Sequence, residues 1–329
     1  MKAIVYRNYG SPDVLQYEEM DKPAPGNGEV LIKVRAASVN PYDWHLMRGK
    51  PYPLRIASGL SKPKDKRLGV DVAGQVEAAG GRVTQLKPGD EVFGCARGAF
   101  AEYACGAETK LVPKPENVTL EQAASAPIAG LTALQGLRRG GLGDRGGVES
   151  GPRVLINGAA GGVGTFAVEI AKCFGAEVTG VCSTKNVEMV RSIGADHVID
   201  YTAEDFTTSG ERYDLILDCM ANHSLSAVRS VLKAKGNYVM VGAMDGGGRW
   251  MTGMLARLFK ARALSSLVGQ KLVMVQANIN KEDLTFLGQL MKTGKVTPVI
   301  DRRNGLHELP GAIRYLEQGH ARGKVVITL

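Results

Sequence analysis

Hydrophobic positions in the first third of the chain fall into short runs that proline and glycine separate. Strand-like runs cover residues 29–36, 71–78 and 103–104. Many short strands with turns between them predict a compact β barrel. We expect two stretches of this region to be irregular, residues 41–59 and the basic, proline-containing loop 61–67.

The pattern changes at residue 120. Residues 121–138 are alanine-rich and helical apart from Pro127 and Gly130, and a glycine-rich linker follows at 140–151. Beyond the linker, strand-like and helix-like segments alternate at residues 154–156, 163–174, 178–182, 187–193, 197–199, 215–218, 225–232 and 238–241. Strands that alternate with helices of this length predict βαβ units and a parallel, doubly wound sheet.

The end of the chain departs from this alternation. After residues 299–301 the chain leaves the predicted sheet, and it finishes with a helix at 309–317 and a strand at 324–328. The fold class is therefore α/β, with two domains. We divide the chain into a β-rich domain (1–125), a doubly wound domain (126–297) and a C-terminal segment (298–329) that returns to the first domain.

A glycine-rich loop joins the first strand of the doubly wound domain to its first helix. Glycine stands at 158, 161 and 164, directly before one apolar helical stripe. Glycines at this spacing allow a tight turn, a close approach to a pyrophosphate and close packing of helix on strand, while the helix N-terminus favours anions. We assign cofactor binding to Gly158, Ala160, Gly161, Gly162, Val163 and Gly164. The alternative is a glycine turn without a ligand.

The residues after the second strand of this domain indicate which cofactor binds. An acidic residue here would bind the ribose 2′-hydroxyl of NAD, but Ser183 stands nineteen residues after Gly164, with Lys185 two further on. A hydroxyl and an ammonium favour a 2′-phosphate, and therefore NADPH. Tyr201, after the third strand, is placed to stack near the adenine or to offer its hydroxyl to the same phosphate. The alternatives are a helix N-cap for Ser183 and a solvated surface position for Lys185.

Composition and charge narrow the classes of partner. The 329 residues carry a net charge of +8, which fits a polyanionic cofactor as well as nucleic acid or an anionic membrane. The basic residues are scattered and aromatic residues make up only 6%, so we expect no nucleic-acid binding. Five cysteines without a Cys-x-x-Cys pair fit a reducing, cytoplasmic compartment. We expect neither a membrane span nor a signal peptide.

An ordered set of motifs extends over nearly the whole chain. The motifs are ASVNPYD at 37–43, GVDVAG at 69–74, KPGDEV at 87–92, AGLTA at 129–133, the loop 158–164, GAD at 194–196 and GHARGK at 319–324. In these motifs the chain resembles the medium-chain dehydrogenase/reductase superfamily, and within it the zinc-free quinone oxidoreductases of the zeta-crystallin type. The resemblance implies a GroES-like catalytic domain, a Rossmann NADP-binding domain and an active site between them.

The resemblance also indicates how this chain differs from the zinc-dependent members, which carry a cysteine, a His-Glu pair and a further ligand. Here Asn40 stands at the cysteine position, and residues 69–71 (Gly-Val-Asp) stand at the His-Glu pair. Asp43 and His45 remain, but two scattered residues do not build a zinc site. We therefore expect no metal. Without a Lewis acid, hydride transfer to a quinone or to the β-carbon of an enone is easier than oxidation of a simple alcohol.

The same resemblance assigns the remaining site residues. It places Asn40 and Tyr42 on the substrate side and Thr132 near the nicotinamide, and these three are our catalytic candidates. The cofactor contacts expected from the C-terminal half are Gly242, Gly323 and Lys324. Tyr52 lies near the proton-donating tyrosine of related enoyl-thioester reductases, with packing or a surface role as the alternative. The alternative for Asn40 is an Asn-Pro turn that fixes the loop.

The implied function is an NADPH-dependent, zinc-independent reductase that transfers hydride to quinones or α,β-unsaturated carbonyl compounds, in a homodimer. Two alternatives are an enoyl-thioester reductase and a cofactor-binding structural or regulatory protein with little turnover. Residues 249–262 mix large apolar and basic side chains. We interpret this segment as a lid or dimer contact near the substrate, with a basic amphipathic helix on an anionic membrane as the alternative.

Overall fold

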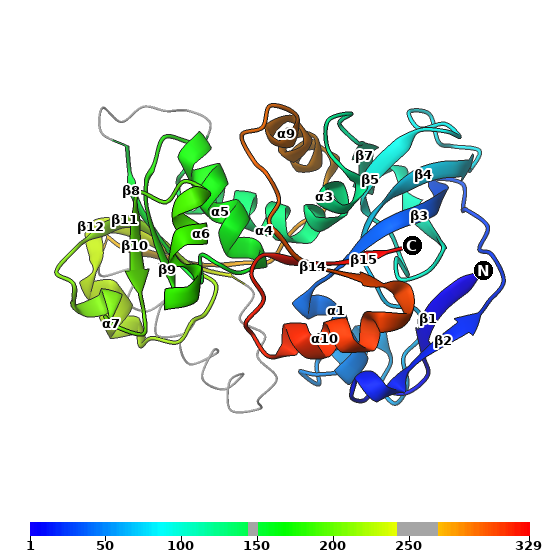
Figure 1. Ribbon diagram of the computed structural model, residues 1–329, viewed down its shortest axis with the longest axis horizontal. Coiled ribbons are helices and arrows are strands. Elements are labelled where there is room, and N and C mark those ends of the chain that lie inside the picture. Colours follow the sequence, from blue (N-terminus) through cyan, green and yellow to red (C-terminus); the bar gives the residue numbers. More distant parts are fainter. Residues whose placement is uncertain (144–150, 242–268) are drawn as a thin grey trace. The chain divides into compact units, whose positions relative to one another are not determined.

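The computed structural model describes residues 1–143, 151–241 and 269–329, which divide into two compact units (Figure 1). The first unit comprises Met1–Leu131 and Asn278–Leu329, and the second comprises Thr132–Ala277. Two features of the sequence analysis, Gly242 and the segment 249–262, lie outside the described residues. In the described part of the chain, no helix has the length and apolar character needed to cross a membrane.

The first unit is built mainly on antiparallel strands. One sheet runs in the order β14 (Ile300–Gly305), β15 (Lys324–Thr328), β3 (Glu29–Val39), β4 (Asp71–Ala79), β5 (Glu91–Cys95) and β7 (Leu111–Pro113), and β6 (Tyr103–Ala107) also pairs with β3. Strands β1 (Lys2–Tyr6) and β2 (Leu15–Glu19) form a separate antiparallel pair. Strand β15 lies antiparallel to β3, with Val325 opposite Val39. The last strand of the chain thus completes the sheet that begins in its first forty residues.

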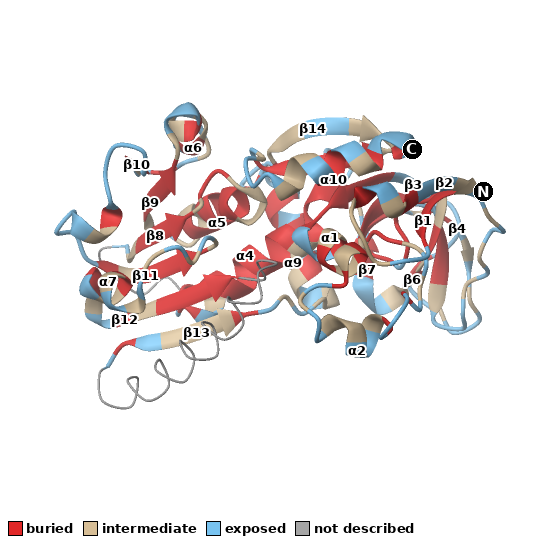
Figure 2. Ribbon diagram, turned by 90° about the horizontal axis from the view of Figure 1, so that it is seen from below, coloured by how far each residue is buried: buried red, intermediate tan, exposed pale blue. Residues whose placement is uncertain are grey.

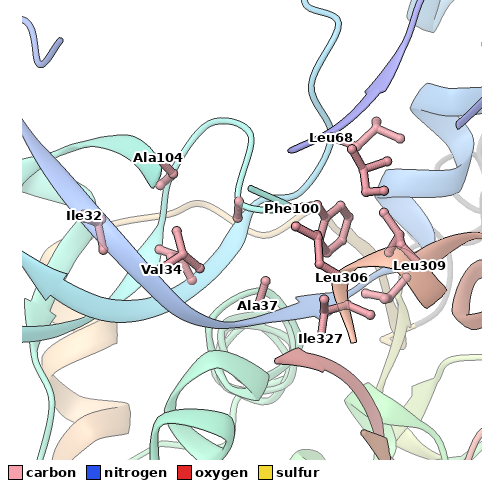
Figure 3. Packing of buried hydrophobic residues seen from close by; sticks show 14 of the residues in the cluster. Ile32, Val34, Ala37, Leu68, Phe100, Ala104, Leu306, Leu309 and Ile327 are labelled. Atoms are coloured by element: carbon pink, nitrogen blue, oxygen red, sulfur yellow. The ribbon is translucent and has the colours of Figure 1, made fainter. Parts of the chain in front are cut away.

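Apolar side chains from both ends of the chain meet in the core of this unit (Figure 3). Val34 and Ala37 of β3 pack in one cluster with Phe100, with Ile327 of β15 and with Leu309 of α10 (Leu309–Glu317). All five side chains are at most 2% exposed. Since full burial of a large apolar side chain contributes about 1.5–3 kcal/mol, this cluster holds the C-terminal segment against the N-terminal strands.

Two helices occupy the stretch 41–59, which we predicted to be irregular. They are α1 (Pro41–Arg48) and α2 (Leu54–Ser58), so this prediction was wrong. Pro41 takes the first helical position of α1, where its missing N–H costs nothing, and the Asp43 carboxylate accepts a hydrogen bond from the N–H of Asn40 at 2.8 Å. This pattern, an N-cap with an acceptor three residues later, is a helix start signal.

The second unit contains a six-stranded parallel sheet in the order β10-β9-β8-β11-β12-β13. The strands are β8 (Arg153–Asn157), β9 (Glu177–Cys182), β10 (His197–Asp200), β11 (Tyr213–Asp218), β12 (Leu232–Val241) and β13 (Lys271–Val275), and the helices are α5 (Gly162–Cys173), α6 (Val187–Ser192) and α7 (Leu225–Ser230). In chain order this is 3-2-1-4-5-6, the order of the Rossmann fold. The predicted doubly wound domain is confirmed.

Two of the predicted helices have other bounds in the structure. The predicted helix 121–138 is two helices, α3 (Leu120–Ser125) and α4 (Pro127–Arg139), because Pro127 lacks the N–H that would continue α3. The predicted helix 225–232 ends at Ser230, and its last residue already belongs to β12. Short 3₁₀ turns complete the chain at Pro12–Val14, Glu108–Lys110, Thr184–Asn186, Phe206–Thr208 and Leu306–Glu308.

The limits of the units differ from the predicted domain boundaries after residues 125 and 297. The first limit falls inside α4, after Leu131, and the second falls after Ala277. Helix α9 (Lys281–Lys292), which we had assigned to the doubly wound domain, therefore belongs to the first unit. The Asn117 side chain donates a hydrogen bond to the carbonyl of Lys292 at 3.0 Å, which ties α9 to the β-rich unit. Amphipathic periodicity predicts such a helix but not the sheet against which it packs.

Candidate functional site

The strand order of the second unit reverses between β8 and β11. In doubly wound sheets, ligands bind at such a point, outside the carboxyl ends of the strands. Gly158 follows β8 here with φ +86°, a left-handed conformation that glycine adopts without strain. The N–H groups of Gly158 and Ala159 both donate to the carbonyl of Val181 on β9, at 3.2 and 3.0 Å. The loop therefore leaves β8 in a fixed, tight turn.

Two glycines at the start of α5 have different roles. A Cβ at Gly164 would lie 2.1 Å from the carbonyl oxygen of Gly158, so helix and loop could not pack this closely with any other residue. A Cβ at Gly161, the N-cap of α5, would meet nothing nearer than 3.5 Å. Gly161, Gly162 and Val163 are half-buried, and the first-turn N–H groups of a helix lack intrahelical acceptors. The loop fits the pyrophosphate of a dinucleotide, with Ala160 6% exposed beside it.

The predicted adenosine-phosphate residues lie at two neighbouring strand ends. Strands β9 and β10 are parallel with Cys182 beside Asp200, and the N–H of Tyr201 donates to the carbonyl of Cys182 at 3.0 Å. The Tyr201 side chain is 57% exposed, and Lys185 is exposed as well. Ser183 occupies an N-cap position, but its hydroxyl makes no capping hydrogen bond; it accepts one from the Asn186 side chain at 3.2 Å.

One carboxylate beside this group was not identified from the sequence. The hydroxyl of Thr202 donates to Asp200 at 2.7 Å and lies 2.9 Å from the hydroxyl of Thr184. Hydrogen bonds from Thr184 and Thr202 hold the pKa of Asp200 below its usual value, so a negative charge stands next to Tyr201. The signal in the sequence was an acidic residue at the end of the third strand.

A second carboxylate, Asp218 at the end of β11, was also missed. It is fully buried and accepts hydrogen bonds from the Asn157 amide at 2.9 Å and the Tyr238 hydroxyl at 2.8 Å. The backbone N–H groups of Met220 and Ala221 donate to it at 2.9 and 2.8 Å. Asp218 thus joins the ends of β8, β11 and β12. Asn157 directly precedes Gly158, so Asp218 is a positioning residue for the start of the glycine loop.

The first unit contains a buried cluster of polar and charged side chains. Lys324 Nζ donates to Asn40 Oδ1 at 2.5 Å and lies 3.6 Å from Asp71 Oδ2. The same Asp71 oxygen accepts from Asn40 Nδ2 and from the Ser38 hydroxyl, both at 2.8 Å, and the other oxygen accepts from the N–H of Ile128 at 3.1 Å. Lys324 is 3% exposed and Asp71 0%. The cluster joins β3, β4, β15 and the start of α4 in one network.

This network decides what the predicted substrate-side residues can do. Both ends of the Asn40 amide are engaged inside the unit, and the side chain is 2% exposed, so Asn40 orients its neighbours. Tyr42, two residues later on α1, is 43% exposed. Thr132 lies on α4 and is 7% exposed. Lys324, which we expected to contact the cofactor, directs its ammonium into the cluster, and Gly323 packs against the carbonyl of Val299.

Comparisons with known proteins agree with this architecture. The alcohol dehydrogenase GroES-like domain family matches residues 26–116, and the zinc-binding dehydrogenase family matches residues 193–327. The chloroplastic quinone-oxidoreductase QR1 of Triphysaria versicolor is 34% identical over 99% of this chain and 98% of its own. The chain belongs to the medium-chain dehydrogenase/reductase superfamily. The family resemblance found in the motifs is confirmed.

Two further relatives agree with a place among the quinone oxidoreductases of this superfamily. The structure of the quinone oxidoreductase from Coxiella burnetii superimposes with a TM-score of 0.83, at 31% identity over 100% of this chain and 99% of that chain. The chloroplastic NADPH-dependent alkenal/one oxidoreductase of Arabidopsis thaliana is 33% identical over 99% of this chain and 79% of its own. The protein is thus an NAD(P)-dependent oxidoreductase with GroES-like and Rossmann domains.

The zinc named in one matching family can be tested against the buried cluster. By the family resemblance, Asn40 stands at the cysteine position of the zinc-dependent members, and Asp71 belongs to the stretch 69–71 that stands at their His-Glu pair. Here the Lys324 ammonium already lies against both side chains, and a fixed ammonium repels a dication that shares its oxygens. Zinc also prefers thiolate, imidazole and carboxylate ligands to an amide. These residues do not fit a zinc ion, and the described ranges contain no group of three or more His, Cys, Asp or Glu side chains placed to hold a metal.

Asp43, next to this cluster, predicts a pH dependence of stability. Burial is the main cause that raises its pKa from 3.8 to about 7; the N–H of Asn40 opposes the rise, and the Asp71 carboxylate adds to it. Between pH 3.8 and about pH 7, the folded chain binds more protons at Asp43 than the unfolded chain does. The contribution of this carboxyl to stability is therefore complete below pH 3.8 and is lost as the pH rises to about 7.

The variant Asp43→Asn tests this prediction, because asparagine does not titrate and its side-chain oxygen can still accept the hydrogen bond from the N–H of Asn40. We expect the unfolding free energy of the wild type, relative to the variant, to fall across this window by at most about 1.4 kcal/mol per pH unit. Urea denaturation of both proteins at several pH values measures the difference. A difference that is constant with pH would contradict a raised pKa at Asp43.

Proposed function

We propose that this protein is an NADPH-dependent reductase that transfers hydride to quinones or to α,β-unsaturated carbonyl compounds. The observation that carries the NADPH preference is the chemistry at the end of β9. Ser183 and the exposed Lys185 follow this strand, where an NAD-specific site would place an acidic residue. Tyr201 lies beside them at the end of β10. A hydroxyl, an ammonium and a phenol together favour a 2′-phosphate over a 2′-hydroxyl.

The acceptor class is supported by the buried cluster and by the relatives. When NADPH is bound it supplies the hydride, and the protein has to bind it, orient the acceptor and exclude water. The Lys324 ammonium, which is bound to Asn40 and faces Asp71, repels a metal ion from these side chains, so the acceptor has to react without a Lewis acid there. Quinones and conjugated carbonyls are already activated acceptors. Relatives named quinone oxidoreductase and alkenal/one oxidoreductase favour the same two classes.

The cofactor preference predicts the effect of Lys185→Ala. A hydrogen-bonded contact between charged groups contributes about 1.5–3 kcal/mol, so we expect NADPH to bind about 10- to 100-fold more weakly. The affinity for NADH should change little, since NADH has no 2′-phosphate. Fluorescence titration with both cofactors measures this, and Lys235→Ala, an exposed lysine near the amino end of β12, is the matched control. An equal loss for NADH and NADPH would overturn the assignment of Lys185.

Turnover tests the acceptor class separately. NADPH oxidation by the purified protein is measured with 9,10-phenanthrenequinone, with a short enal and with crotonyl-coenzyme A. Turnover of the quinone or the enal supports the proposal. Turnover of the thioester alone would favour the enoyl-thioester reductase, and tight NADPH binding without any turnover would favour a structural or regulatory protein. We also propose that the protein is a homodimer. Light scattering on the purified protein measures its molecular mass in solution and tests this.

A further inference from the structure

Exposed apolar side chains of the first unit gather on α2 and the turns beside it. Tyr52, Ile56 and Leu60 are 66%, 73% and 75% exposed. Ile56 lies on α2, Tyr52 in the turn before it, and Leu60 directly after Gly59, which ends the helix. Figure 2 shows that α2 has no buried residue. Among the large hydrophobic side chains that are exposed in the described ranges, Ile56 and Leu60 are the two most exposed.

The same segment is strongly basic. Residues 50–67 contain six lysines and arginines and one acidic residue. Lys62, Lys64 and Lys66 are exposed, whereas Asp65, the acidic residue, already lies 3.4 Å from Arg67 and 3.8 Å from Arg97. The positive charge of the segment is therefore not balanced within it. We call residues 50–67 the α2 patch.

Polar contacts on its inner side hold the α2 patch in place. The Tyr9 hydroxyl donates to the carbonyl of Gly59 at 2.6 Å, and Arg55 Nε donates to the carbonyl of Gly49 at 2.9 Å. The Arg55 guanidinium also stacks over the rings of Tyr9 and Tyr52, 4.4 and 5.0 Å from their centres. These contacts involve the backbone, Arg55 and the Tyr52 ring, and they leave the Ile56 and Leu60 side chains exposed. The apolar face is thus built into the ordered structure of the unit.

We propose that the α2 patch binds the surface of an anionic lipid bilayer. Apolar side chains that enter the headgroup boundary, with lysines beside them over acidic headgroups, are the two contributions that hold a short helix at a membrane surface. Tyr52, Ile56 and Leu60 supply the first contribution, and Lys62, Lys64 and Lys66 supply the second. The inference does not depend on the proposed function, since it uses none of the cofactor or cluster residues.

Charge favours a bilayer over the other surfaces that would cover an apolar face. In a two-fold contact between two copies of the chain, each patch would face its own like charges, which repel. A nucleic acid would satisfy the lysines, but its phosphates would leave Ile56 and Leu60 in water. An anionic bilayer is the partner that accommodates both kinds of side chain.

Sedimentation of the full chain with vesicles tests the proposal. The vesicles are phosphatidylcholine alone and phosphatidylcholine with about 30% phosphatidylglycerol, at low salt and at about 0.5 M NaCl, where screening is strong. The variants are Lys62→Glu/Lys64→Glu/Lys66→Glu and Ile56→Ser/Leu60→Ser. The matched control is Lys87→Glu/Lys110→Glu/Lys292→Glu, three exposed lysines of the first unit that lie outside the α2 patch. Thermal unfolding of each variant identifies any loss of fold.

We expect binding to the anionic vesicles and not to the neutral ones. The lysine triple variant should bind about tenfold more weakly or worse, and the serine variant should lose binding at both salt concentrations, while the control binds like the wild type. An equal loss of binding in the control would mean that binding depends on the net charge of the whole chain and not on the α2 patch, and it would overturn the proposal. An absence of vesicle binding would also overturn the proposal. If the serine variant instead changes the sedimentation coefficient of an oligomer, the apolar side chains contact a second copy of the chain and not a bilayer.

Discussion

Lys324→Met is expected to lower the free energy of unfolding by about 3–5 kcal/mol, because it leaves the buried Asp71 carboxylate without a cation. Both side chains are almost completely buried and 3.6 Å apart. Burial lowers the pKa of Lys324 and raises that of Asp71, and each group opposes the shift of the other. Methionine has a similar length, so the loss reports the charge and not a cavity. Urea denaturation of wild type and variant measures it.

A second substitution separates the charge from the packing. In Lys324→Met/Asp71→Asn the buried negative charge is gone. The asparagine oxygen can still accept from the N–H of Ile128, and its NH2 group can donate to the Ser38 hydroxyl, so we expect most of the lost stability to return. The control is Lys22→Met, which breaks the exposed pair of Lys22 with Glu77 and should cost less than about 1 kcal/mol. If Asp71→Asn does not restore stability to the double variant, the ion pair is not the source of the loss.

Gly164→Ala is expected to weaken NADPH binding by about a hundredfold or more, a loss of roughly 2.7 kcal/mol. The added methyl group would lie 2.1 Å from the carbonyl oxygen of Gly158, which is backbone and cannot rotate away. Helix and loop must therefore separate, and the first-turn N–H groups move from the positions where they would meet a pyrophosphate. Overpacking of this kind also costs about 1–3 kcal/mol of stability. Cofactor titration and thermal unfolding measure the two effects.

Gly161→Ala is the matched control three residues earlier. Its methyl group would have ordinary contact at 3.5 Å, so the fold should keep its stability. A loss of NADPH affinity without a loss of stability would then show that the ligand itself approaches the backbone at Gly161. Normal NADPH binding by Gly164→Ala would contradict the assignment of this loop as the cofactor site.

The sequence predicted correctly those parts of the fold whose sequence pattern repeats within a few residues. The alternation of segments from residue 154 to 241 and the glycines at 158, 161 and 164 predicted a Rossmann sheet with a loop after its first strand, and the structure has both. The helix α1 was missed although its start signal is local, because Asp43, three residues after Asn40, was not taken as the reciprocal cap. Both results depend on residues within a few positions of each other.

The candidate site was predictable only where it follows a strand directly. Ser183 and Tyr201 follow β9 and β10, and parallel pairing brings them to one edge of the sheet. Asp200 and Asp218 end their strands in the same way, yet their partners Thr202 and Tyr238 identify them only once the hydrogen bonds are known. Asn40 was assigned to the substrate side, and the structure shows its amide enclosed between Lys324 and Asp71.

The sequence by itself determined the fold class, the superfamily and the position of the glycine loop, because periodicity and short motifs are properties of neighbouring residues. Only the tertiary structure decided that Lys324 meets Asn40, which precedes it by 284 residues, that Asp218 joins three strands, and that Ile56 and Leu60 stay exposed among lysines. Which strands lie side by side, and which side chains are left uncovered, depends on the packing of the whole unit. No local pattern of polar and apolar residues encodes that packing.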